Sequence, residues 1–249
     1  MALLTPEVHS YFDEATNAAC YIVKDPSSTS CAIIDSIWNF DLASGQTNTE
    51  HADMLADDII ANGWQLDWVI ETHVHADHLS AAPYLAQRFG AKIAIGSNID
   101  TVQKVFGKVF NAGTEFQRDG SQFDRLFEDG ECFDIGNMSV QVMHTPGHTP
   151  ACVTYIIGDA AFIGDTLFMP DFGTARADFP GGSAKDLYQS IQKILALPDQ
   201  TRLFLRHDYK APGRDAFCWQ TTVADQKARN IHVGGQKTED EFVSFRTAR

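Results

Sequence analysis

The sequence predicts an α/β fold in which mixed β-sheets carry helices on their outer faces. Short apolar runs bounded by turn residues, typical of strands, alternate with longer segments whose apolar residues recur at helical spacing. Strand-helix-strand pieces are mixed with hairpins, and this mixture indicates mixed sheets. No Gly/Ser-rich linker interrupts the 249 residues, so we expect a single domain over residues 1–249.

In the first part of the chain, each predicted strand leads into a turn or a helix. Turn residues close the apolar runs, and Asn-Gly or Gly ends two of the predicted helices. Residues 36–48 are polar and predict a loop, whereas residues 111–129 match no regular element. The expected strands are 19–23, 31–34, 66–70 and 92–95, and the expected helices are 51–61, 78–89 and 99–110.

The second part of the chain begins with a strand and a hairpin, whose tight turn is Gly158-Asp159. A loop rich in Gly, Asp and Phe covers residues 170–182, and Ser183 is expected to cap the helix that follows. The last dozen residues are expected to be frayed. The expected strands are 138–143, 151–157, 160–163 and 203–205, and the expected helices are 184–196 and 219–229.

Composition and charge narrow the classes of partner and compartment. The formal net charge is −14, which repels nucleic acid phosphates and argues against a nuclease. No stretch approaches the ~18 apolar residues of a membrane helix, and the N-terminus does not resemble a signal peptide. The five cysteines lack CxxC spacing, so free thiols in a reducing cytosol are expected. We therefore expect a cytoplasmic protein that binds neither nucleic acid nor membrane.

A cluster of candidate metal ligands follows the strand predicted at 66–70. The segment THVHADH contains His73, His75, Asp77 and His78. Its first two histidines are two residues apart, so they project together from an extended segment or a turn, unlike the HExxH histidines of a zincin helix. Imidazole and carboxylate suit Zn, Fe or Mn. A His-rich surface turn, or an N-cap formed by Asp77, is the alternative interpretation.

Three further motifs each end a predicted strand. They are TPGHT with His148, IGDT with Asp165 and RHDY with His207. Each motif alone is weak, because a single His or Asp at a turn is more often solvated, capping or structural. Their occurrence in one chain with the THVHADH segment indicates a single metal site at one edge of the folded sheet.

The ordered set THVHADH, TPGHT, GDTLF and RHDY resembles the metallo-β-lactamase superfamily. The resemblance implies an αββα sandwich, in which two mixed β-sheets are flanked by helices and the metal lies at one edge of the sheets. The segments ETHVHADHLSAA, HTPGHTPACVTY, GTARADFPGG and HDYKAPGRD are more closely similar to the persulfide dioxygenase (sulfur dioxygenase) branch. This likeness runs from Val8 to Val233.

The resemblance to this branch implies one Fe(II) per chain, held by His73, His148 and Asp165. Two His and one carboxylate on one face leave other coordination positions open for a thiolate and dioxygen. The resemblance gives the other motif residues a role in orienting the ligands and bound water; these residues are His75, Asp77, His78 and His207. Members of the branch are often dimers, so a homodimer is a further expectation.

The implied reaction oxidises glutathione persulfide with O2 to sulfite and glutathione, and iron carries the redox chemistry. Because the substrate is anionic, positive charge is needed near the metal, and Arg176 is the first candidate for binding a glutathione carboxylate. Tyr209, in the HDY segment, is the candidate for contact with substrate or a ligand oxygen. The structural alternatives are an ion pair of Arg176 with Asp171 or Asp178, and a core position for Tyr209.

Two other functions stay open at this point. A glyoxalase-II-like thioesterase would use the same residues to bind two metal ions, such as zinc, with a bridging hydroxide. A non-catalytic metal-binding or sulfide-sensing protein would also keep the ligands. Metal content and oxygen uptake distinguish the three, because only the dioxygenase combines one iron with persulfide-dependent consumption of O2.

Overall fold

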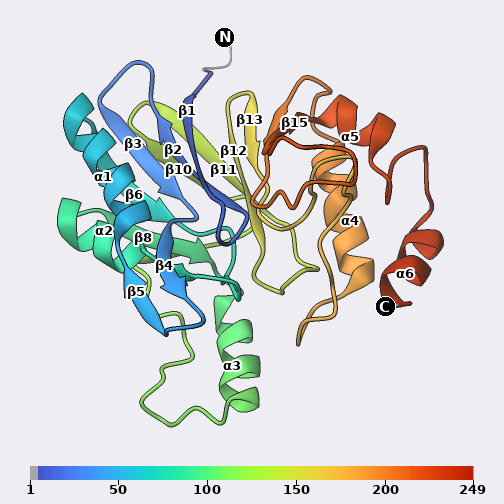
Figure 1. Cartoon of the computed structure of the whole chain (residues 1–249), viewed down its shortest axis with the longest axis horizontal. Helices are drawn as coiled ribbons and strands as arrows, with labels where there is room; N and C mark the ends of the chain where they lie inside the picture. Colours follow the sequence, from blue (N-terminus) through green and yellow to red (C-terminus); the bar gives the residue numbers. More distant parts are fainter. Residues whose placement is uncertain (1–4, 249) are drawn as a thin grey trace.

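The computed structural model describes residues 5–248, in which two six-stranded β-sheets pack face to face between outer helices (Figure 1). In spatial order, the first sheet consists of β1 (Glu7–Asp13), β2 (Ala18–Lys24), β3 (Ser30–Ile34), β6 (Gln65–Ile70), β8 (Lys92–Gly96) and β9 (Arg125–Phe127). The strands from β1 to β3 pair antiparallel, and those from β3 to β9 pair parallel. The expectation of mixed sheets is therefore confirmed for this layer.

The second sheet is mixed as well. In spatial order, it consists of β10 (Cys132–Ile135), β11 (Met138–His144), β12 (Val153–Ile157), β13 (Ala160–Phe162), β14 (Arg202–Phe204) and β15 (Gln220–Thr222). The neighbours β13 and β14 pair parallel, whereas the other neighbouring strands pair antiparallel. A small third sheet is formed by β5 (Gln46–Asn48), β4 (Ile37–Asp41) and β7 (Leu79–Ser80).

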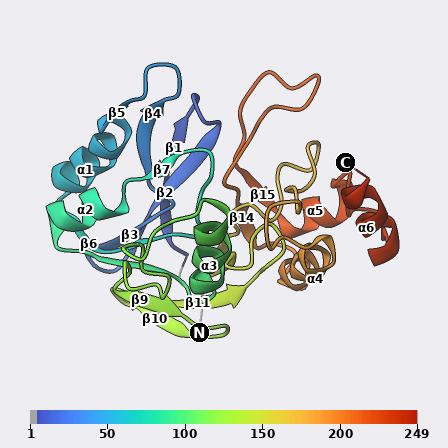
Figure 2. The same cartoon turned by 90° about the horizontal axis from the view of Figure 1, so that it is seen from below.

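Helices cover the outer face of each large sheet. The helices of the described residues are α1 (Glu50–Asn62), α2 (Ala82–Phe89), α3 (Ile99–Val109), α4 (Ala184–Leu195), α5 (Val223–Arg229) and α6 (Glu239–Thr247). Helices α1 and α2 pack on the first sheet, and α4, α5 and α6 pack on the second. Helix α3 lies at one end of the sandwich, and Figure 2, viewed from that end, shows it between the two halves. This arrangement confirms the αββα sandwich.

The apolar core between the sheets explains why the central strands are apolar throughout. On β2, Ala19, Tyr21 and Val23 face the second sheet, whereas Cys20 and Ile22 pack against the layer of α1. A strand that is buried on both faces has no solvent side on which polar residues would alternate with apolar ones. The five cysteines are free thiols, as expected.

The structure corrects three expectations about element boundaries. The helix predicted at 78–89 begins at Ala82, because Leu79–Ser80 pairs with β4 as β7. The helix predicted at 219–229 begins at Val223, because the residues before it pair with β14 as β15. The loop predicted at 36–48 contains β4 and β5, which pair with each other.

The C-terminal segment is ordered as far as residue 248, so the expectation of fraying is wrong over the described part. Helix α6 begins with a capping box, in which Thr238 and Glu241 bond to each other's backbone N–H groups. Phe242 is fully buried and lies against Tyr188 of α4. This aromatic contact and the buried hydrogen bond from Arg246 to the carbonyl of Ala175 anchor the helix to the second layer. No helix within residues 5–248 has the length and apolarity that a membrane span requires.

Candidate metal centre

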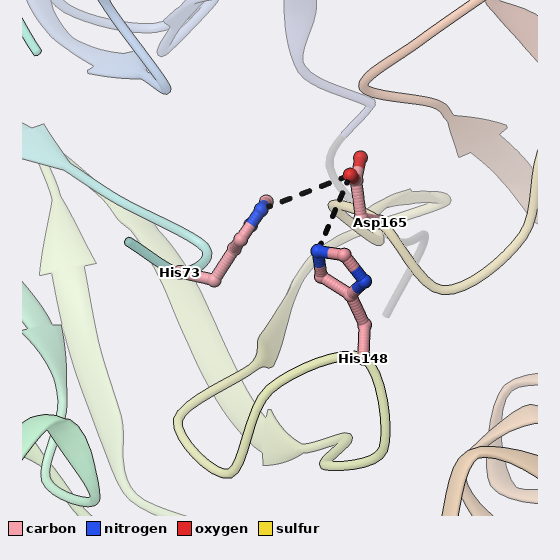
Figure 3. Close-up of side chains that lie close together, drawn as sticks. All are labelled: His73, His148 and Asp165. Carbon is pink, nitrogen blue, oxygen red and sulfur yellow. Dashed lines mark ion pairs between the residues drawn. The ribbon is translucent and has the colours of Figure 1, made fainter. Parts of the chain in front are cut away.

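The C-terminal ends of four strands bring the candidate metal ligands together. His73 follows β6 of the first sheet, whereas His148, Asp165 and His207 follow β11, β13 and β14 of the second sheet. The ligand atoms of His73, His148 and Asp165 all lie within 4.8 Å of one another. Figure 3 shows Oδ2 of Asp165 between the two imidazoles, at 3.8 Å from Nε2 of His73 and 3.6 Å from Nε2 of His148.

Hydrogen bonds to the outer ring nitrogens leave the inner nitrogens of both imidazoles free to bind a metal. Nδ1 of His148 donates to the backbone carbonyl of Arg176 at 2.9 Å, so its Nε2 carries the lone pair. Nδ1 of His73 lies 3.0 Å from the Thr72 hydroxyl, which itself donates to Asp35 at 2.8 Å and therefore accepts from the imidazole. Burial lowers the pKa of His73, and the neutral form is the one that binds metal.

The carboxylate of Asp165 fits a cation. The residue is 8% exposed, and its Oδ1 atom is buried without a hydrogen-bond partner among the described residues. A buried carboxylate oxygen that lacks a donor is costly unless a cation satisfies it. The set of two imidazole lone pairs and one carboxylate is thus suited to a first-row divalent metal.

Two glycines allow the ligand loops to approach their neighbours closely. Gly147 has a φ of +142°, and a Cβ atom on it would lie 2.3 Å from the backbone Cα of Leu187 in α4. Gly164 has a φ of +51°, and a Cβ atom there would lie 2.5 Å from the Thr72 hydroxyl. Only glycine meets both demands, so the residues before His148 and Asp165 are determined by packing as well as by backbone conformation.

His207 and Asp77 extend the cluster on one side. Nδ1 of His207 donates to the carbonyl of Asn17 at 3.1 Å, which leaves its Nε2 lone pair facing the cluster. That Nε2 lies 3.3 Å from Asp77 and 3.7 Å from Oδ1 of Asp165. His207 is buried and Asp77 is exposed. The structure therefore places both residues beside the three candidate ligands.

His75 is held by two buried carboxylates. Its Nε2 lies 3.0 Å from Glu71 and 3.4 Å from Asp35, and its Nδ1 is buried without a partner among residues 5–248. Burial would lower the pKa of His75, but the hydrogen bonds to Asp35 and Glu71 outweigh it and raise the pKa to about 9. No role is predicted from the sequence for Asp35 or Glu71. Their positions could have indicated a role, because Asp35 and Glu71 each lie at or next to the end of an apolar run, as Asp165 does.

His78 has neither ring nitrogen free, and its partner is a residue that the sequence reasoning did not single out. Nδ1 of His78 donates to the carbonyl of Leu79 at 2.9 Å, and its Nε2 accepts a short hydrogen bond from Nη2 of Arg206. Arg206 is 1% exposed. Burial and the nearby guanidinium both lower the pKa of His78. The RHDY motif includes Arg206, but no sequence signal indicates that this side chain is buried.

The candidate substrate residues lie at a pocket beside the metal centre. A pocket of about 550 Å³ is lined by His73, Asp165, Arg176, His207 and Tyr209, among others. The ring of Tyr209 stacks on that of His207 at 5.3 Å. Arg176 forms two hydrogen bonds with Asp178, at 2.6 and 2.8 Å, which is one of the ion pairs considered as an alternative to substrate binding.

An apolar cavity adjoins the metal centre on the side of α3. It has a volume of about 460 Å³ and shares His148 with the pocket described above. Its apolar lining includes Val102, Phe106 and Phe123. Two pockets therefore adjoin the metal centre: one is lined by polar and charged side chains, and the other is mostly apolar.

Several known proteins are similar to this chain over most of its length. The metallo-β-lactamase superfamily matches residues 14–207. A probable metallo-hydrolase from Burkholderia pseudomallei is 53% identical over 252 residues, which cover 97% of this chain and 85% of that protein. A beta-lactamase hydrolase-like protein from Agrobacterium fabrum is 52% identical over 244 residues, or 98% of this chain, but the chain spans only 56% of that relative.

Similarity extends to persulfide dioxygenases. The human mitochondrial persulfide dioxygenase ETHE1 is 30% identical over 201 residues, covering 80% of this chain and 66% of that protein. The crystal structure of ETHE1 from Myxococcus xanthus has a TM-score of 0.78 and 28% identity, covering 97% of this chain and 90% of that one. The family match, the sandwich of two sheets and the His/Asp cluster at their edge agree with one another. The chain belongs to the metallo-β-lactamase superfamily.

Proposed function

We propose that the protein is a mononuclear iron dioxygenase that oxidises glutathione persulfide. In the balanced reaction, one persulfide, one O2 and one water give glutathione, sulfite and two protons. The S–S bond breaks, the outer sulfur is oxidised and O2 is reduced. The observation that carries the proposal is the group of His73, His148 and Asp165, whose free donor atoms lie within 4.8 Å of one another. Two imidazoles and one carboxylate form the ligand set of non-haem Fe(II) oxygenases.

The similarity to persulfide dioxygenases supports this substrate class. The human protein is named persulfide dioxygenase ETHE1, and the Myxococcus xanthus structure shares the name ETHE1; the likeness covers 80% and 97% of this chain respectively. When bound, Fe(II) would supply the activation of dioxygen beside a thiolate sulfur. The protein would supply the geometry, through imidazoles that are already oriented by their outer nitrogens.

Tyr209 is suited to hold an anionic group of the substrate. Burial raises the pKa of its phenol, and the negative charges of Asp165 and Asp77 raise it further. The hydroxyl therefore stays protonated at neutral pH and can donate a hydrogen bond to a substrate sulfur or oxygen. Its ring forms part of the pocket wall beside the metal centre.

Arg176 would have to share its charge with Asp178 while binding a glutathione carboxylate. The Arg176 side chain is 51% exposed and lines the pocket, so its outer surface is accessible to a ligand. The existing two-point pair with Asp178 reduces the positive charge that it offers. We therefore expect Arg176 to affect KM for glutathione persulfide more than kcat.

A dinuclear metallo-hydrolase is the second candidate. Two observations favour it: the Burkholderia pseudomallei relative is named a probable metallo-hydrolase, and His75, Asp77 and His78 form a second group of candidate ligands within 4.8 Å. Two metal ions with a bridging hydroxide would hydrolyse a thioester such as lactoylglutathione. The two candidates differ in metal count and in the use of oxygen.

Metal analysis combined with an oxygen electrode tests the proposal. Protein purified without added metal is expected to contain about one iron per chain, the occupancy of a two-His-one-carboxylate site, and to consume O2 only with glutathione persulfide. Asp165→Ala serves as the inactive control, because it lacks the candidate carboxylate ligand. Two zinc ions per chain with cleavage of lactoylglutathione and no oxygen uptake would establish the hydrolase instead.

A further inference from the structure

Arg206 is a buried cation without a carboxylate partner. It lies between β14 and His207 and is 1% exposed. Its Nη1 donates to the carbonyl of Ala19, its Nη2 donates to Nε2 of His78, and its Nε has no hydrogen-bond partner among residues 5–248. Within the same residues, no Asp or Glu oxygen lies within 4.0 Å of the guanidinium nitrogens. Buried guanidinium groups usually gain a direct ion pair that offsets their desolvation; Arg206 has none among the described residues, although its charge acts on the buried Asp35.

We propose that Arg206 is an internal cation that occupies one half of the His/Asp cluster and so restricts the centre to a single metal ion. This inference rests on the proposed mononuclear function and assigns a cause to it. The group of His75, Asp77 and His78 could otherwise hold an ion beside the first site. Arg206 approaches that group from the buried side, through His78.

The hydrogen bonds of His78 leave no lone pair for a metal. One ring nitrogen carries the proton that is donated to Leu79, and the lone pair of the other is taken by Arg206. A second ion would therefore have to break the bond to Arg206 and leave the three buried nitrogens of the guanidinium with a single acceptor, the carbonyl of Ala19.

The charge of Arg206 also disfavours a second metal ion at His78. A guanidinium stays protonated in proteins, so its positive charge is permanent. A divalent ion at His78 would lie next to this charge, and because His78 is buried, water would screen the repulsion between the two cations only in part. The charge of Arg206 also reaches His73. However, none of His73, His148 and Asp165 gives a lone pair to Arg206 in a hydrogen bond, so this site keeps its donor atoms for an ion.

Counting bound metal in Arg206→Met tests the proposal. Methionine removes the charge and the donors but still fills a buried apolar space. Metal-free proteins are dialysed to equilibrium against Co²⁺, and the bound cobalt per chain is measured by elemental analysis. Wild type is expected to bind one ion and Arg206→Met two, which is a twofold rise. Arg202→Met is the matched control, because Arg202 lies on β14, just before Arg206 in the chain, but pairs with Asp159 outside the cluster, and this variant should bind one ion.

Two further variants keep the test decisive. Adding His78→Ala to Arg206→Met should return the count to one, because the freed imidazole is then absent. Should Arg206→Met not fold, as judged by circular dichroism, His78→Ala alone still decides: it should bind one Co²⁺ with unchanged affinity, since His78 is no ligand in the wild type. A wild type that binds two ions, a folded Arg206→Met that binds one, or weakened binding in His78→Ala would each overturn the role of Arg206.

This readout is independent of turnover. A wild-type protein that binds one ion but takes up no oxygen with glutathione persulfide would defeat the proposed dioxygenase and leave the role of Arg206 standing. Oxygen uptake by a wild type that binds two ions would defeat the role of Arg206 and the single-metal count, and would leave only the dioxygenase activity standing.

Discussion

Two of the imidazoles that face the metal centre are oriented by groups far away in the sequence. His207 donates to the carbonyl of Asn17 and His148 to the carbonyl of Arg176. The histidines themselves could be predicted from their motifs. Their partners could not, because a backbone carbonyl is present in every residue type and only the folded chain determines which one is near. The buried position of Arg206 could not be predicted for the same reason, since its acceptor is the backbone carbonyl of Ala19.

Removal of the Asp165 carboxylate should empty the centre. Asp165→Ala is expected to lose nearly all iron, because the two remaining imidazoles alone bind a divalent ion much more weakly. Iron per chain is measured by elemental analysis of protein purified without added metal. His144→Ala is the control, since Nε2 of His144 bonds to the carbonyl of Phe127 away from the cluster. Full iron retention in Asp165→Ala would contradict the ligand assignment.

The hydroxyl of Thr72 should matter for metal affinity although it touches no metal. It links His73 to the buried carboxylate of Asp35. Thr72→Val keeps the shape of the side chain but removes that link, and losses of this kind weaken metal binding by about 10–100-fold. Competition with a chromophoric chelator measures the change. Thr72→Ser retains the hydroxyl and should bind nearly as well as wild type, so equal affinity in all three proteins would refute this role.

At the scale of elements, the ligands come from residues that directly follow strands. The runs leading to His73, His148, Asp165 and His207 are apolar enough to be predicted as strands from the sequence, and the structure confirms strands at all four places. Parallel neighbours such as β13 and β14 end at the same edge of a sheet, which is why Asp165 and His207 meet.

Other elements were missed because their sequence signals are weak or local. The strand β1 is partly exposed over most of its length and shows no regular alternation of apolar and polar residues. Helix α6 buries little besides Phe242, so its apolar face is too narrow to predict a helix. Its capping box, Thr238 with Glu241, was nevertheless visible in the sequence. The segment Leu79–Ser80 became β7 through pairing with β4, a contact that no local pattern indicates.

The turn before His148 should not tolerate a side chain. In Gly147→Ala, the new Cβ would clash with the backbone of Leu187 and would require a strained φ, so the free energy of unfolding should fall by more than about 2 kcal/mol. Urea denaturation measures it. Gly45→Ala is the control, because Gly45 also has a positive φ of 72° but no atom within 4 Å of the place that a Cβ would occupy, and it should lose about 1 kcal/mol. Equal losses would show that packing against α4 is unimportant.

At the scale of the whole molecule, the metal centre joins the two sheets. His73 belongs to the first sheet, whereas His148 and Asp165 belong to the second. The αββα arrangement could be predicted through the resemblance of the motifs, and the structure confirms it. Which side chains of the two layers meet in the core could not be predicted, because that depends on how the sheets are oriented. The assignment of the entire chain to one domain stays a prediction.

Metal removal should therefore lower the thermal stability of the whole fold. An ion that binds only the native state at 100 times its Kd stabilises it by about 2.7 kcal/mol, which corresponds to about 5–10 °C in Tm for a protein of this size. Calorimetry before and after treatment with a chelator measures the difference. Asp165→Ala, which lacks a ligand, should melt at the same temperature under both conditions. An unchanged wild-type Tm would show that the ion does not hold the layers together.

The distribution of His73, His148 and Asp165 along the chain also has a consequence for biosynthesis. A ribosome makes the first imidazole long before the carboxylate, and β13, which positions that carboxylate, pairs in parallel with the later strand β14. The complete ligand set therefore forms only after β14 has been made and has paired with β13. Metal loading becomes a late event, and a chain that carries its metal ion has already brought its two layers together.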